Sequence, residues 1–140
     1  MSQRCARTGS MALGCVALMW VGLAAAAVQQ TPRATAAKLT NPVASSPTAI
    51  AAGQQLYQKY CRFCHGATGR GDSPMAPKDM KPSNLTDATW DRGSSDGEIF
   101  VVIQEGAGPD FKMKGLKGKL SEQDTWNLVN YVRSLGATAK

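Results

Sequence analysis

The chain has 140 residues, with 16 Lys and Arg against 10 Asp and Glu, which gives a formal net charge of +6. This length allows one domain and a leader, and it excludes a two-domain protein. The positive charge does not indicate nucleic-acid binding, because the main run of basic residues has no interleaved aromatic residues and the N-terminus predicts export.

An export signal is predicted over residues 1–27. Arg4 and Arg7 give it a positive start, an uncharged and largely apolar run follows from Met11 to Val28, and consecutive alanines offer the small residues that signal peptidase accepts. The apolar run of about 18 residues would form a helix of roughly 27 Å, near the lower limit for spanning a bilayer. We therefore predict a cleaved signal peptide and a periplasmic protein, with an uncleaved membrane anchor as the alternative.

Residues 28–47 are rich in Thr, Pro, Ala, Ser and Gln and show no hydrophobic period, so we predict a flexible linker. The folded domain is expected to occupy residues 48–140. Its first helix has Ser46 as the N-cap and Pro47 at the first helical position. Helical spacing then places four residues on one face: Ile50, Gly53, Tyr57 and Tyr60.

The first helix leads into the sequence C-R-F-C-H, formed by residues 61–65. Cys61 and Cys64 lie on the same side of a helical turn, so their sulfurs can form thioether bonds to two vinyl groups on one edge of a porphyrin. His65 follows at the position from which an imidazole can bind the iron. It is the only histidine of the chain, which excludes a second histidine ligand from the same chain. The motif predicts one covalently attached haem c.

Three other interpretations of the two cysteines explain less of the pattern. A thioredoxin-like dithiol requires a βαβ unit, which the sequence does not predict, and gives no role to the histidine. A structural zinc site needs four ligands, and the further cysteines, Cys5 and Cys15, fall in the predicted leader. A local disulfide between Cys61 and Cys64 stays open in an oxidising compartment, but it leaves His65 unexplained.

The remaining chain predicts a long loop and two more helices. Residues 66–84 are dense in Gly, Pro, Lys and Asp and are expected to form a loop over the haem. A second helix is predicted to begin at Ser95, which forms a capping box with Glu98, and to end at Gly106. A third is predicted over residues 121–136, with a serine and an aspartate in its first turn. No alternating run predicts a strand, so the pattern favours an all-α domain.

These elements resemble those of the small, exported monohaem class I cytochromes c of bacteria, and the resemblance covers about residues 48–136. It includes Gly53 and Tyr57 on the first helix, where the glycine lets the last helix cross closely, and Tyr131 on that last helix. The resemblance implies the class I cytochrome c fold, with three main helices and long loops packed around one covalent haem.

The resemblance also implies further haem-contacting residues. Met113 precedes the closing helix in M-K-G-L-K-G-K-L-S, similar to the family's M-P-x-F-x-x-x-L-S, which implies it as the second axial ligand. Lys114 stands where the family has proline, and this difference is expected to loosen the loop. Pro82 resembles the family's proline whose carbonyl accepts a hydrogen bond from the haem-binding histidine. Met75 and Met80 follow the haem motif and are expected to be packing residues.

A histidine and a methionine together leave the iron no open position for a substrate, so the resemblance implies a periplasmic one-electron carrier and not an enzyme. The alternative is the cytochrome subunit of a periplasmic dehydrogenase or oxidase complex. A haem sensor or peroxidase-like protein would need a vacant or labile sixth position. Four lysines form either a solvated loop or a docking surface for an acidic redox partner: Lys112, Lys114, Lys117 and Lys119.

Overall fold

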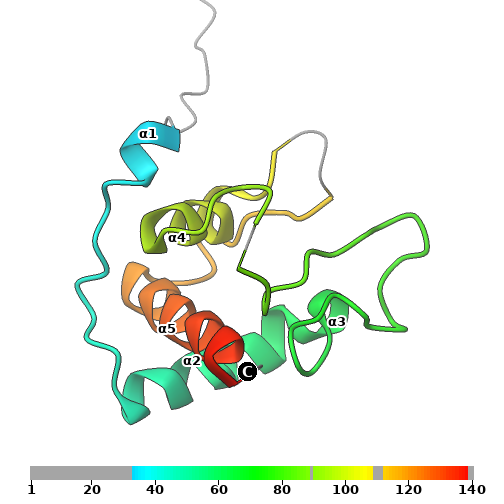
Figure 1. The fold of residues 1–140 in the computed structure, drawn as a ribbon, viewed down its shortest axis with the longest axis horizontal. Helices are drawn as coiled ribbons and strands as arrows, with labels where there is room; N and C mark the ends of the chain where they lie inside the picture. The colour runs from blue at the N-terminus through cyan, green and yellow to red at the C-terminus, as the bar shows by residue number, and fades with distance from the viewer. Residues whose placement is uncertain (1–32, 89, 109–111, 139–140) are drawn as a thin grey trace, which may run out of the picture.

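The computed structural model describes residues 33–88, 90–108 and 112–138, so the predicted leader lies outside the described residues. The described part is helical and contains isolated β-bridges but no strand, which confirms the all-α prediction. Within it, no helix has the length and apolar character needed to cross a membrane. Figure 1 shows five helices in this part of the chain: α1 (Arg33–Ala36), α2 (Pro47–Tyr60), α3 (Arg62–His65), α4 (Asp96–Glu105) and α5 (Glu122–Thr138).

The three long helices begin where their N-caps predict. The Ser46 hydroxyl accepts a hydrogen bond from the backbone N–H of Ala49 at the start of α2, and Ser95 and Glu98 form the reciprocal capping box of α4. Helix α4 ends at Gly106, which adopts a φ of 89°. Helix α5 continues two residues beyond the predicted end at Gly136, since that glycine does not adopt a positive φ.

Helices α2 and α5 cross in close contact, as Figure 1 shows. A Cβ atom at Gly53 would overlap the carbonyl oxygen of Asn127, so only glycine permits this approach. One turn further along, the rings of Tyr57 and Tyr131 pack with their centroids 5.1 Å apart. The family resemblance implies that Gly53 lets the last helix cross closely, and the structure confirms this. The crossing also fixes the end of α2, from which the C-R-F-C-H turn continues.

Helix α4 packs against α5 through an aromatic stack and through polar contacts, one of which is buried. The rings of Phe100 and Trp126 stack with centroids 4.1 Å apart and an interplanar angle of 22°. The Gln104 side-chain amide donates a hydrogen bond to the hydroxyl of Thr125, which is itself fully buried. Because a buried amide without a partner would be costly, this hydrogen bond sets the position of α4 along α5.

Residues 33–46, which composition predicts as part of a flexible linker, pack against the domain. Ala36 is only 2% exposed, and its carbonyl lies against Gly97 at the start of α4. The Asn41 side chain donates to Asn130 on α5 over 2.9 Å, while the Asn130 amide donates to the carbonyl of Val43 over 3.1 Å. We call residues 33–46 the strap. Its composition did not reveal these contacts, because they are made by single small or polar side chains and by the backbone.

Arg33 joins the strap to α4 through an ion pair with Glu98 of 3.0 Å. Hydrogen bonds from the backbone and side chain of Ser95, followed by the one from Arg33, lower the pKa of Glu98 from 4.5 to about 2. A carboxylate whose pKa is lowered by folding stabilises the folded state above its unfolded pKa. That stabilisation is lost as the pH falls through the folded pKa.

We therefore predict that Glu98→Gln lowers the free energy of unfolding at pH 7, and that the difference from the wild type shrinks as the pH falls from about 4.5 to about 2. Urea denaturation followed by circular dichroism at a series of pH values measures this difference. A difference that stays constant over the whole range would show that the charge of Glu98 does not stabilise the fold.

Candidate haem site

Cys61, Cys64 and His65 lie on one helical turn directly after α2. The backbone N–H of His65 donates to the carbonyl of Cys61 over 2.9 Å, and that of Cys64 donates to the same carbonyl over 3.1 Å. All three side chains line one cavity. Both thiols are free, so the local disulfide is not formed, and the described residues hold no cluster of three or more metal-ligating side chains that would suit zinc.

Burial favours the neutral forms of Cys61 and His65. Desolvation, and next the neighbouring Cys64, raise the pKa of Cys61 to about 12, so its sulfur is a thiol at neutral pH. Desolvation also lowers the pKa of His65, against the opposing effect of its hydrogen bond to Ser83. The imidazole is therefore neutral at pH 7 and has one nitrogen available for a metal.

A backbone carbonyl decides which imidazole nitrogen that is. Nδ1 of His65 lies 3.0 Å from the carbonyl oxygen of Ser83, which can only accept, so the proton sits on Nδ1 and Nε2 is left available to a metal. The family resemblance implies the carbonyl of Pro82 as the acceptor of this hydrogen bond. The structure places Pro82 in the cavity wall and directs its carbonyl at Gly71, where a Cβ atom would overlap it.

Tyr57 holds the end of the C-R-F-C-H turn through a hydrogen bond, a role that the helical pattern did not reveal. It is fully buried, and its hydroxyl donates to the carbonyl of Gly66 over 2.7 Å, at the residue after His65. Burial, together with nearby ionisable groups, raises the pKa of Tyr57, so the hydroxyl remains a donor at any pH near neutral. The sequence signal for this role was the combination of Tyr57 on the first helix with Gly66 directly after the C-R-F-C-H motif.

The cavity has a volume of about 500 Å³, within the range of cofactor sites. Side chains of α4, α5 and the loop before α4 make its walls largely apolar: Leu85, Trp90, Ile99, Val102, Ile103, Leu128 and Val132. The two thiols and the imidazole stand at one side of this apolar space. An apolar chamber with two thiols and a neutral histidine fits a covalently bound haem, because the macrocycle needs a dry environment and the iron needs nitrogen or sulfur donors.

Two of the three described methionines line the cavity. Met113 and Met80 both do, whereas Met75 is 61% exposed and lies outside it. The Met113 segment is held to the end of α4, since its carbonyl accepts from Ala107 over 3.1 Å and the N–H of Leu116 donates to the carbonyl of Ile103 over 2.8 Å. These backbone hydrogen bonds hold the loop in place although Lys114, and not the family's proline, follows Met113.

Comparison with known proteins decides the family of this fold and cavity. Residues 48–132 match the family described as cytochrome c oxidase, cbb3-type, subunit III. The chain belongs to this family. It is 34% identical over 90 residues to the cbb3-type cytochrome c oxidase subunit CcoP of Rhodobacter capsulatus, covering 61% of this chain and 29% of that protein. It is 30% identical to subunit FixP of Rhizobium meliloti, covering 66% of this chain and 29% of that protein.

Solved structures agree with this assignment. A chain of the reducing HAO-like protein complex Kustc0457/Kustc0458 of Kuenenia stuttgartiensis superposes with a TM-score of 0.61 at 28% identity, covering 71% of this chain and 48% of that one. Cytochrome cL of Methylophaga aminisulfidivorans gives a TM-score of 0.52 at 25% identity, with 64% and 57% covered. The class I cytochrome c fold is thereby confirmed, and family membership implies a covalent haem c.

The cofactor is expected to be necessary for the fold, because the apolar walls of the cavity have nothing else to cover them. We predict that Cys61→Ala combined with Cys64→Ala yields a chain with little helical circular dichroism and no haem bound after denaturation. The matched control is Ser45→Ala with Ser73→Ala, two small polar residues outside the cavity, which should keep both signals. A helical, protease-resistant double cysteine variant would contradict this dependence.

Proposed function

We propose that this domain is a one-electron carrier with one haem c, bound through Cys61 and Cys64 and ligated by His65 and Met113. The observation that carries the proposal is that one apolar cavity is lined by the C-R-F-C-H turn and by the methionine loop. The bound haem supplies reversible one-electron chemistry. A single C-x-x-C-H motif in the chain supports one haem.

With both ligands supplied by the protein, the iron would have no open position for a substrate, which favours electron transfer over bond-making catalysis. If His65 and Met113 both ligate the iron, the thioether would stabilise the ferrous form and raise the potential. The protein then has to hold His65 and Met113 in similar positions in both oxidation states. The Ser83 carbonyl does so for His65, and the backbone bonds to the end of α4 do so for Met113.

A fixed subunit of a larger redox complex is the second candidate function. The relatives CcoP and FixP are named as subunits of cbb3-type cytochrome c oxidases, and this chain spans only 29% of the length of each. Such a subunit would use the same haem site. It would differ in having a permanent and more apolar contact with its partner.

We place the domain in the periplasm, after a signal peptide of residues 1–27 and a connecting segment of residues 28–47. The positive start and apolar run of the leader support export, and haem attachment to C-x-x-C-H in bacteria takes place outside the cytoplasmic membrane. If the leader is retained as an anchor, the strap connects it to the domain on the α4 side (Figure 1). The haem domain, residues 48–140, is then tethered but otherwise unchanged.

An acidic redox partner is proposed to dock at the lysine-rich loop. Lys112 and Lys114 line the mouth of the haem cavity, and Lys119 is exposed on the same loop. Lys112 is paired with Asp79, and Lys117 with Glu105 over 2.8 Å, which reduces their share of the positive field. Among the described residues no carboxylate forms an ion pair with Lys114 or Lys119, so these two lysines carry most of the attraction.

The choice between Met113 and Met80 as axial ligand gives a direct test of the proposal. Met113→Ala should abolish the sulfur-to-iron charge-transfer band of the oxidised protein and lower the reduction potential, since the thioether favours ferrous iron. Met80→Ala should keep the band, and so should the control Met75→Ala, whose side chain is exposed. Loss of the band in Met80→Ala and its retention in Met113→Ala would make Met80 the ligand.

The docking proposal predicts that Lys119→Glu slows electron transfer to an acidic acceptor a few-fold at low ionic strength, because it removes long-range attraction without touching the haem cavity. The matched control is Lys38→Glu, which makes the same charge change on the strap. Stopped-flow rates against salt concentration, with the potential measured in parallel, separate steering from redox effects. Rates that respond to neither salt nor Lys119→Glu would favour the permanently bound subunit.

A further inference from the structure

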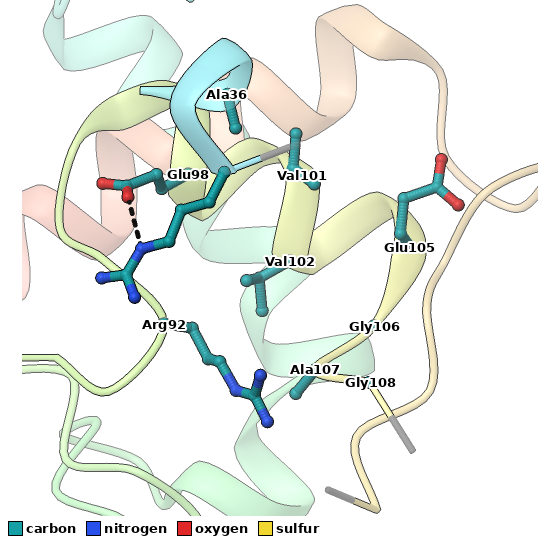
Figure 2. A pocket seen from close by; sticks show the side chains of 10 residues that line it. Ala36, Arg92, Glu98, Val101, Val102, Glu105, Gly106, Ala107 and Gly108 are labelled. Carbon is teal, nitrogen blue, oxygen red and sulfur yellow. Dashed lines mark hydrogen bonds and ion pairs between the residues drawn. The ribbon is translucent and has the colours of Figure 1, made fainter. Parts of the chain in front are cut away.

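The strap meets α4 at its first turn, beside a second cavity of the domain. This cavity has a volume of about 320 Å³ and lies between the strap, α4 and the loop after α4. Figure 2 shows its lining, with Ala36 of the strap and Val101 and Val102 of α4. Three residues line this cavity and the haem cavity alike and form the wall between them: Arg92, Val102 and Ala107. Helix α4 therefore contributes to both cavities, so a shift of α4 would reach the haem site.

We infer that the strap is a positioning element for the axial ligand Met113. By fastening the start of α4 to α5, the strap holds α4 in place, and with it the methionine loop that is bound to the end of α4. The inference rests on the proposed ligation by Met113 and deepens it, because it names what keeps that ligand in position. Displacement of the strap would let Met113 leave the iron more often.

The contact between the strap and α4 requires a glycine. A Cβ atom at Gly97 would overlap the carbonyl oxygen of Ala36 and the Cβ atom of Leu39, both of which belong to the strap. Gly97 does not have a positive φ, so its backbone conformation does not call for glycine. Alanine is the better helix former at such a position. The close approach of the strap is therefore the feature that accounts for a glycine in the first turn of α4.

Two hydrogen bonds fasten the other part of the strap to the middle of α5. Asn130 is only 6% exposed, and the strap binds both ends of its side-chain amide. The amide oxygen accepts from Asn41 over 2.9 Å, and the amide nitrogen donates to the carbonyl of Val43 over 3.1 Å. A buried amide without these partners would be costly, so the strap is held to α5 as well as to α4.

The far end of α4 carries the methionine loop. In addition to the hydrogen bonds of the Met113 segment, the N–H of Lys117 donates to the carbonyl of Gln104 over 3.0 Å. A Cβ atom at Gly115 would overlap the same carbonyl oxygen, so the loop lies directly on the last turn of α4. A helix of 10 residues, about 15 Å long and hydrogen-bonded along its length, moves as one body. A shift at its first turn, where the strap binds, is thus passed to the loop.

The experiment compares Gly97→Ala and Asn41→Ala with Gly136→Ala in the haem-loaded protein. Gly97→Ala pushes the strap away from α4, Asn41→Ala weakens its hold on α5, and neither residue lines the haem cavity. Gly136→Ala is the matched control, because it adds the same methyl group to α5, where the Cβ atom would meet the carbonyl oxygen of Thr86 at an ordinary 3.7 Å. Hydrogen exchange measured by mass spectrometry reports whether the strap stays packed, with α2 as the internal reference.

Imidazole added to the oxidised protein tests the ligand, because it can bind the iron only after Met113 has left it. We expect the sulfur-to-iron charge-transfer band to disappear several-fold faster in Gly97→Ala and in Asn41→Ala than in the wild type. Hydrogen exchange should become faster in the strap and stay unchanged in α2, and Gly136→Ala should equal the wild type in all respects. A merely structural strap would alter hydrogen exchange without changing the rate of imidazole binding.

Faster exchange in the strap with an imidazole rate equal to that of Gly136→Ala overturns the inference and leaves the proposed function intact. Unchanged exchange in the strap of both variants overturns it as well, since these contacts then do not hold the strap. If Gly97→Ala does not fold, Asn41→Ala decides by the same two measurements. A wild-type protein whose oxidised form lacks the charge-transfer band would overturn the methionine ligation itself, and the inference with it.

Discussion

The close crossing of α2 and α5 at Gly53 is the constraint on which the haem site depends. Because no side chain stands between the helices at this point, the Tyr57 ring can pack on Tyr131 and still reach the carbonyl of Gly66 with its hydroxyl. That hydrogen bond ties the end of the C-R-F-C-H turn to the helix pair. A side chain at Gly53 would push α5 away, and the turn would lose its fixed position relative to the cavity walls that α5 supplies.

The apolar cavity explains why a domain of this size tolerates so long a loop. From Gly66 to Ser95 the described chain has no regular element, and its order comes from a few backbone contacts, such as the bond from Leu85 to the carbonyl of Gly69. A loop without secondary structure is stable only when its side chains pack on something. Here Met80, Pro82 and Leu85 of the loop line the cavity that would hold the family's cofactor, so a bound haem would complete the core.

Electrostatics divide the surface of the domain into two regions with different roles. At the strap, Arg33 and Glu98 neutralise each other and hold the N-terminal segment against α4. In the lining of the haem cavity, the three lysines outnumber the two carboxylates, Asp79 and Asp91, so a net positive field remains there.

The local features of this protein could be read from the sequence, since they depend on residues a few positions apart. Ser46 and Ser95 specify helix starts through their side-chain caps. The spacing of Cys61 and Cys64 likewise predicts a haem-binding turn from the local sequence. The tertiary structure decided the packing of the strap and the choice of the Ser83 carbonyl as the partner of His65. It also decided that Met80 lines the cavity as Met113 does, and that Arg92 lies in a wall between two cavities. Those arrangements join segments far apart in the chain, and no local pattern encodes which of several chemically equivalent groups comes within reach.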